Sequence, residues 1–254
     1  MTDCVNSVTG AIAHCRSISD RGASIGFVPT MGDLHEGHLS LIHRAKQEND
    51  FVVVLVFVNP TQFDEQNDYV AYETPLALDV HLADTAGADL VFAPAVEDIY
   101  PDDYSFRISE CNLSQELEGA SRRGHFDGVL TIVMKLLNIV RPTRAYFGEK
   151  DWQQLQLVRQ MTTAFFLDTS IIACPTVREA DGLAMSSRNK RLSDKERALA
   201  PLLYETLSSS RTEEEMSKWL KSKGIDVDYI ERRGSRLIGA VRIGSTRLID
   251  NVES

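Results

Sequence analysis

Two histidines stand three residues apart at the end of the segment Phe27–His38, which reads FVPTMGDLHEGH. An apolar run comes before them, Pro29 and Gly32 are typical of a turn, and apolar residues at helical spacing follow. A helix that starts between the histidines directs unpaired N–H groups and the positive end of its dipole toward the preceding loop, where phosphate commonly binds. We therefore predict an anion site with His35 and His38 as donors to phosphoryl oxygens.

Two other interpretations of the histidine pair stay open at this point. In the first, one imidazole caps the helix and the other is an ordinary surface residue, and a bare HxGH match does not decide against it. In the second, the pair binds zinc. That alternative is weaker, because the metalloprotease pattern places its two histidines four apart inside a helix, whereas these are three apart at a helix start.

The elements that must position the histidines alternate between strands and helices. The β-branched run FVVVLVFV at 51–58 is typical of a central parallel strand that is covered on both faces. Alternation of this kind predicts an α/β fold with a Rossmann-like, doubly wound parallel sheet, whose ligands bind beyond the carboxyl ends of the strands. The expected strands are 24–28, 51–58, 89–93, 145–147 and 171–173. One helix is expected to begin near residue 36, and others to span 75–86, 129–140 and 151–166. In the last of these, Phe165 is expected to face inward.

The alternating pattern ends near Pro175, and a polar run follows it. The remaining chain has polar helical segments at about 193–208 and 212–223 and short alternating strands within 227–249. We therefore predict a Rossmann-like domain over residues 1–176 and a small α+β domain over residues 177–254.

Composition excludes several classes of protein. A net charge of −10 over 254 residues argues against a nucleic-acid partner, which would favour a basic surface. The longest apolar run has eight residues, too few to span a membrane, and the N-terminus lacks a signal-peptide pattern. We expect a cytoplasmic protein without membrane contact, whose four cysteines are reduced thiols because they show no paired spacing: Cys4, Cys15, Cys111 and Cys174.

Three further motifs follow HEGH in a fixed order: NPTQF at 59–63, FGEKDWQQL at 147–155 and READGLAMSSRN at 178–189. Together they resemble the pantoate–β-alanine ligase family of the HxGH nucleotidyltransferase superfamily, and the ending TRLIDN at 246–251 is also similar to that family. The resemblance implies ATP-dependent condensation of (R)-pantoate with β-alanine through a pantoyl adenylate, with release of AMP and pyrophosphate. Such an adenylate supplies the leaving group that a carboxylate lacks. The first domain would then bind ATP and pantoate, and the second would serve as a lid.

The resemblance also implies roles for individual residues. The catalytic residues that it implies are His35, His38, Lys150 and Arg188, with His38 stabilising the charge at the α-phosphorus. Its ATP-binding residues are Met31, His35, His38, Gly148, Lys150, Asp151, Val177, Met185, Ser186, Ser187 and Arg188. Its residues for pantoate and β-alanine are Met31, Asn59, Gln62, Phe63 and Gln154. Mg²⁺ is expected with ATP, and Asp79 is its candidate ligand, directly or through water.

Family members are commonly homodimers, so we expect one here, with small molecules as the other partners. Two features depart from the family: Thr74 occupies a commonly basic position, and the chain after Arg191 is shorter than usual. The alternative function is transfer of a nucleotide to a phosphorylated small-molecule acceptor, although such an acceptor would favour Arg or Lys in place of Gln62 and Gln154. A silent nucleotide sensor would not need all four catalytic residues. A tRNA-charging role is disfavoured by the acidic charge and by the lack of an anticodon-binding extension.

Overall fold

The structure is a computed structural model that describes residues 2–63 and 75–253, so the departure at Thr74 lies outside the described residues. The chain forms two compact units, residues 1–148 with 153–174 and residues 149–152 with 175–254. Residues 149–152, which carry Lys150, thus group with the C-terminal unit. The assignment of folding domains with a boundary after residue 176 stays a prediction.

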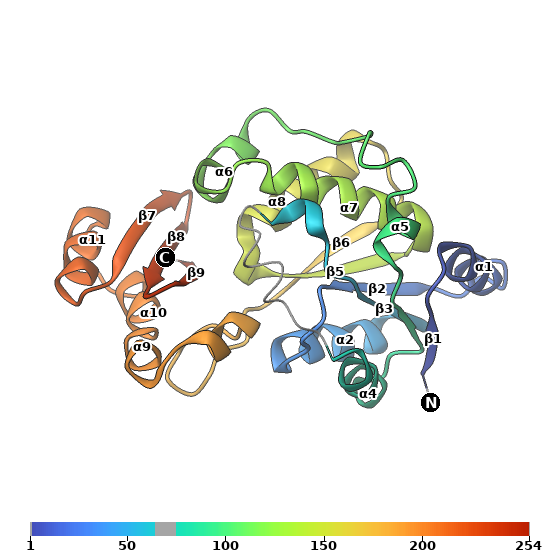
Figure 1. The fold of residues 1–254 in the computed structure, drawn as a ribbon, viewed down its shortest axis with the longest axis horizontal. Helices are drawn as coiled ribbons and strands as arrows, with labels where there is room; N and C mark the ends of the chain where they lie inside the picture. Colours follow the sequence, from blue (N-terminus) through green and yellow to red (C-terminus); the bar gives the residue numbers. More distant parts are fainter. Residues whose placement is uncertain (1, 64–74, 254) are drawn as a thin grey trace. The chain divides into compact units, whose positions relative to one another are not determined.

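Within the described part of the first unit, six parallel strands form one sheet in the order β1-β4-β3-β2-β5-β6 (Figure 1). β2 pairs with β3 on one side and with β5 on the other, so the strand order reverses at the carboxyl ends of β2 and β5. This is the crevice position where doubly wound sheets bind ligands, and it confirms the predicted fold. The strands are β1 Asp3–Val5, β2 Ile25–Thr30, β3 Phe51–Val56, β4 Leu90–Phe92, β5 Arg144–Gly148 and β6 Ser170–Cys174.

Helices cover both faces of this sheet. Apolar side chains of α1, α7 and α8 pack on one face, and those of α2 and α4 pack on the other (Figure 1). The helices of this part of the chain are α1 Val8–Ser19, α2 Glu36–Glu48, α4 Leu76–Ala86, α5 Val96–Ile99, α6 Leu117–Ser121, α7 His125–Val140 and α8 Trp152–Ala164.

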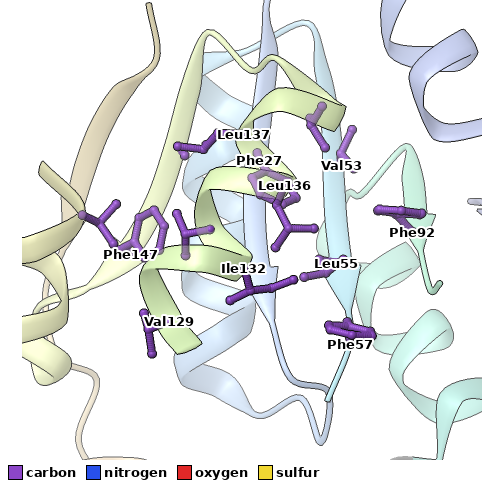
Figure 2. Close-up of a cluster of buried hydrophobic side chains, with 14 of the residues drawn as sticks. Phe27, Val53, Leu55, Phe57, Phe92, Val129, Ile132, Leu136, Leu137 and Phe147 are labelled. Carbon is purple, nitrogen blue, oxygen red and sulfur yellow. The ribbon is translucent and has the colours of Figure 1, made fainter. Parts of the chain in front are cut away.

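The larger core lies between α7 and the sheet, where Ile132 and Leu136 of the helix lie over Leu55 and Phe27 of the strands (Figure 2). Phe27 has no exposed surface and Leu136 is only 1% exposed. Burial of each such side chain contributes about 1.5–3 kcal/mol to folding. The apolar stripe of α7 thus holds the strands whose ends carry the candidate site.

Two features of the first unit differ from the sequence-based expectations. The strand β1 and the helices α1, α5 and α6 were not predicted, and α1 begins after Ser7, whose side chain accepts the Gly10 N–H. The inward position predicted for Phe165 is wrong, because α8 ends at Ala164 and this ring is 53% exposed. The chain turns at Phe166, whose φ is +55°, so the helical spacing no longer directs residue 165 toward the core.

The second unit contains an antiparallel sheet in the order β7-β8-β9 with helices packed on it (Figure 1). Two-residue turns join the strands, and Gly234 and Gly244 take positive φ values there. The helix predicted at 193–208 is two helices, because Pro201 lacks the N–H that a continuous helix needs. The elements are α9 Asp194–Leu199, α10 Leu202–Leu207, α11 Glu213–Ser222, β7 Asp226–Arg233, β8 Arg236–Ile243 and β9 Thr246–Glu253.

Candidate active site

The two histidines cap the helix that carries them. His35 is the N-cap of α2, and its Nδ1 accepts the Gly37 N–H at 3.1 Å. The Nδ1 of His38 accepts the His35 N–H at 3.3 Å, so the two imidazoles form a reciprocal capping box. Their ring centroids are 4.1 Å apart. The predicted helix start between the histidines is confirmed, and the capping role that we considered for one imidazole applies to both.

This arrangement assigns the hydrogen of each neutral imidazole. A ring nitrogen that accepts a hydrogen bond carries no proton, so the hydrogen of each neutral ring lies on Nε2. Both rings therefore present an Nε2–H donor at the start of α2, at the positive end of the helix dipole. Donors at a positive helix end suit an anion such as phosphate, whereas zinc would need unprotonated nitrogens.

A buried carboxylate holds the loop before the histidines. Asp79 of α4 has no exposed surface, and its two oxygens accept the N–H groups of Asp33 at 3.1 Å and Leu34 at 2.8 Å. Asp33 has a φ of +50°, a conformation that non-glycine residues rarely adopt. The carboxylate thus stabilises an unusual loop that leads into α2. Its predicted contact with Mg²⁺ stays a prediction.

Three of the predicted substrate residues contact one another where β2 and β3 end. Asn59 donates to Gln62 Oε1 at 3.0 Å, and the Gln62 amide nitrogen donates to Met31 Sδ at 3.0 Å. Tyr100 donates to Asn59 Oδ1 at 2.6 Å, which fixes the orientation of both amides. Burial raises the pKa of the Tyr100 hydroxyl to about 12, so this donor keeps its proton at neutral pH. Phe63 follows the same turn, Pro60–Gln62, and is half-buried.

The start of α7 also contacts the turn Pro60–Gln62. His125 Nδ1 lies 2.7 Å from the Gln62 carbonyl oxygen, and its Nε2 lies 3.2 Å from Arg122 Nη1. Gly128 approaches so closely that a Cβ there would lie 2.3 Å from the Thr61 carbonyl oxygen. Sequence reasoning missed these residues, because the apolar stripe that predicted the helix begins only at residue 129. The glycine one position before that stripe was the available signal.

The second unit carries Lys150 in the turn Glu149–Asp151. Its side chain is 19% exposed, and Nζ lies 3.6 Å from Asp151 Oδ1. Asn251 of β9 donates from Nδ2 to the carbonyl oxygens of Glu149 and Lys150, each at 2.9 Å. The turn that presents the lysine is thus bonded to the last strand of the described chain.

The predicted second phosphate-binding segment also lies in the second unit. Arg178 forms an isolated antiparallel bridge with Ala184, and the Met185 N–H donates to the Val177 carbonyl at 3.0 Å. Ser186 then caps the 3-10 turn Ser187–Arg191 by accepting the Arg188 N–H at 3.3 Å. The segment begins from a short hairpin and presents polar side chains at the start of a turn.

The predicted site residues therefore fall into two sets, one in each unit. The first set is Met31, His35, His38, Asn59, Gln62, Phe63, Asp79, Gly148 and Gln154. The second set is Lys150, Asp151, Val177, Met185, Ser186, Ser187 and Arg188. Gly148 ends β5, and Gln154 is half-buried in the first turn of α8 next to Gln153, whose buried amide instead bonds the Glu118 N–H at 3.0 Å.

Other features of the described chain bear on ligands and location. Residues 2–63 and 75–253 contain no group of three or more His, Cys, Asp or Glu side chains arranged to bind a metal. No helix in those same ranges combines the length and the apolar character that a membrane span requires. The four cysteines carry reduced thiols.

Comparisons with known proteins show the family of this chain. The family model for pantoate-beta-alanine ligase matches residues 3–253. A pantothenate synthetase of Bdellovibrio bacteriovorus is 48% identical over 92% of this chain and 93% of its own, and one of Coxiella burnetii (strain RSA 331) is 47% identical over 99% and 97%.

Solved structures of the same family have the same fold. A pantoate-beta-alanine ligase from Francisella tularensis, solved in complex with beta-gamma ATP and beta-alanine, has a TM-score of 0.94 and 42% identity, covering 100% of this chain and 98% of its own. A pantothenate synthetase from Thermus thermophilus has a TM-score of 0.90 and 40% identity over 99% of both chains. The chain therefore belongs to the pantoate–β-alanine ligase family, whose members use ATP to form an amide bond between pantoate and β-alanine.

Proposed function

We propose that this chain condenses pantoate with β-alanine through a pantoyl adenylate. The pantoate carboxylate attacks the α-phosphorus of ATP and displaces pyrophosphate, and the neutral β-alanine amine then attacks the adenylate carbonyl and displaces AMP. The observation that carries the proposal is the histidine-capped start of α2, where two imidazole donors lie at the positive end of the helix, a position that suits a polyphosphate. Neither step needs a covalent enzyme intermediate, so positioning and charge neutralisation provide the acceleration.

The first unit has two tasks in this proposal. His38 and His35 donate to phosphate oxygens, and His38 stabilises the charge that builds at the α-phosphorus. Gln62 binds pantoate through an amide whose orientation Asn59 fixes, and that amide can both donate to the carboxylate and accept from a hydroxyl. Met31 and Phe63 contact the gem-dimethyl group, and Gln154 supplies a second amide.

The second unit provides the cations. Lys150 neutralises the β- and γ-phosphate oxygens, and Arg188 offers a bidentate fork to the same anion. Ser186 and Ser187 add hydroxyl donors. The adenosine contacts that we propose are Gly148, Asp151, Val177 and Met185.

Magnesium enters this reaction as part of the MgATP substrate. A carboxylate that binds Mg²⁺ must turn an oxygen toward the ion, yet Asp79 has no exposed surface and both of its oxygens accept backbone N–H groups. The contacts of Asp79 thus support its role in holding the loop, and its contact with Mg²⁺, directly or through water, stays a prediction. Mg²⁺ keeps its waters and takes phosphate oxygens as ligands.

The cellular setting is also a proposal. We propose a cytoplasmic enzyme, because its four cysteines carry reduced thiols, as cysteines do in a reducing compartment. We further propose that it is a homodimer, as its family suggests, and that its other partners are ATP, pantoate and β-alanine.

The test is a product analysis with ATP and Mg²⁺. Pyrophosphate release should require pantoate, and AMP should accumulate with pantothenate only after β-alanine is added. Formation of ADP in place of AMP would refute the proposed ligase reaction. Pyrophosphate release that requires a phosphorylated acceptor, and not pantoate, would instead support the nucleotidyltransferase alternative.

A further inference from the structure

Two adjacent polar residues near the end of the chain are buried in the second unit and have no role in the reaction described so far. Asp250 and Asn251 of β9 are each 3% exposed. Burial of polar groups costs free energy unless their hydrogen bonds are made, so their partners show what the fold gains from them. Each side chain bonds a different segment, and each of those segments leads into a predicted phosphate-binding group.

Asn251 holds the turn that carries Lys150. Its Oδ1 accepts from Arg236 Nη1 at 2.5 Å, which directs its NH₂ group to the carbonyl oxygens of Glu149 and Lys150, each at 2.9 Å. Arg236 also lies 3.6 Å from the Glu149 carboxylate. Two successive carbonyls of a three-residue turn are thus fixed by one amide, whose orientation a guanidinium sets.

Asp250 holds the hairpin that leads to Ser186 and Arg188. Its oxygens accept from Arg178 Nη1 at 2.6 Å and Nη2 at 3.0 Å, and the pair is bidentate. Arg178 also donates to the Gly182 carbonyl at 3.0 Å, inside the hairpin. Its guanidinium lies 3.9 Å from the centre of the Tyr204 ring.

The two side chains are linked to each other through the backbone. Asp250 Oδ1 also accepts the Asn251 N–H at 2.8 Å, and Arg178 Nη2 lies 3.4 Å from the Asn251 carbonyl oxygen. The contacts therefore form one continuous path from the Lys150 turn through β9 to the Arg178 hairpin. A shift of β9 would displace both segments together.

We propose that Asp250 and Asn251 are positioning residues that hold the two cationic segments in register for one polyphosphate. The inference rests on the proposed function of Lys150 and Arg188. Neither Asp250 nor Asn251 contacts the nucleotide in this proposal. They set ATP affinity and the adenylation rate by fixing the positions of the turn that carries Lys150 and of the hairpin that leads into residues 186–188.

The decisive variant is Asn251→Ala, with Val252→Ala as its matched control. Val252 is the next residue of the same strand, is partly buried and packs against the apolar core of the unit. Asn251→Ala should weaken ATP binding by about tenfold, the effect of two lost hydrogen bonds on the lysine turn, and should leave the pantoate KM within about twofold. Val252→Ala should keep ATP binding within about twofold of the parent while it lowers Tm.

A double-mutant cycle on the ATP Kd, measured by calorimetry, separates positioning from a general structural role. If Asn251 acts through the lysine turn, Asn251→Ala should cause less than about twofold further weakening in a Lys150→Ala background. Equal weakening with and without Lys150, or an equal loss from Val252→Ala, would overturn the proposal. Parent-like ATP affinity in Asn251→Ala would also overturn it.

Two provisions keep the test decisive. If Asn251→Ala does not fold, Arg236→Gln is the substitute variant, because it removes the charge that orients the Asn251 amide. It should weaken ATP binding about threefold, and parent-like ATP binding would overturn the proposal.

The binding readout does not require catalysis. A parent protein that binds ATP but forms no pantothenate would therefore refute the proposed function while the cycle still decides the positioning role.

Discussion

The substitution Asp79→Asn distinguishes two roles for one buried carboxylate. If Asp79 holds the loop before α2, as its contacts with Asp33 and Leu34 indicate, the protein needs the carboxylate even without ligands. If Asp79 instead serves mainly to bind a metal, burial of the carboxylate in the unliganded protein costs at least as much as its two N–H contacts return, and removal of the charge should stabilise the fold or leave it unchanged. The two roles therefore predict opposite signs for the change in stability.

The magnitude follows from the two contacts. The carboxylate oxygens accept N–H groups at 3.1 and 2.8 Å. An asparagine of the same shape keeps one oxygen but turns an NH₂ group toward the other N–H. One charge-assisted bond is lost, worth about 1.5–3 kcal/mol, and the remaining bond loses its charge assistance, about 1 kcal/mol more. The free energy of unfolding should fall by about 2.5–4 kcal/mol.

The assay is urea unfolding of the unliganded protein in EDTA. Asp98→Asn is the control, because Asp98 is exposed at the start of α5, and we expect it to stay within about 0.5 kcal/mol of the parent. The displaced loop should also lower kcat with saturating MgATP. An Asp79→Asn protein that is as stable as the parent, or more stable, would refute the positioning role and restore the metal role.

Three further predictions concern other parts of the site. His38→Ala and Lys150→Ala should each lower kcat by about 100-fold or more in the pyrophosphate assay, the loss typical of one preorganised donor, and parent-like turnover would remove that residue from the mechanism. Gly128→Ala should raise the pantoate KM without changing the ATP KM, because its methyl group would lie 2.3 Å from the Thr61 carbonyl oxygen, and an unchanged pantoate KM would show that the turn does not bind pantoate. Tyr100 has a folded pKa raised to about 12 by burial, above the usual value near 10, so its contribution to stability should be complete below pH 10 and be lost as pH rises from 10 to 12. Melting curves of Tyr100→Phe should lack this component, and identical alkaline profiles would contradict it.

Much of the fold could be predicted because its signals are local. The run at 51–58 has no polar alternation, and it forms the central strand β3 Phe51–Val56. The start of α2 at Glu36 was visible in the change from a turn to helical spacing. The spacing of apolar residues indicates which face of a helix or strand is buried, so a prediction from spacing is wrong beyond the end of that element. Phe165 has the right spacing for the core, yet it lies outside because α8 stops one residue earlier.

The contacts that hold the site were not predictable in this way, because they join residues that are far apart in the sequence. Asp79 bonds Leu34 across 45 positions, and Asn251 bonds Lys150 across 101. The motif that contains Lys150 and the ending that contains Asn251 were both recognisable. Nothing in either segment indicates that the amide of one would bond the carbonyls of the other. Only the packing of β9 beside the turn supplies that information.

The histidine pair shows how a local contact decides between chemical roles. Spacing alone allowed the imidazoles to act as phosphate donors, as helix caps or as zinc ligands. Because each Nδ1 accepts a backbone N–H, the hydrogen of each neutral ring lies on Nε2, and that nitrogen then has no lone pair with which to accept a proton. Neither His35 nor His38 can take the proton of the β-alanine ammonium at Nε2 while the capping box is intact. The nucleophile of the first step is already an anion and needs no base, so the pair suits adenylation as two donors, and the amine must lose its proton elsewhere before it attacks.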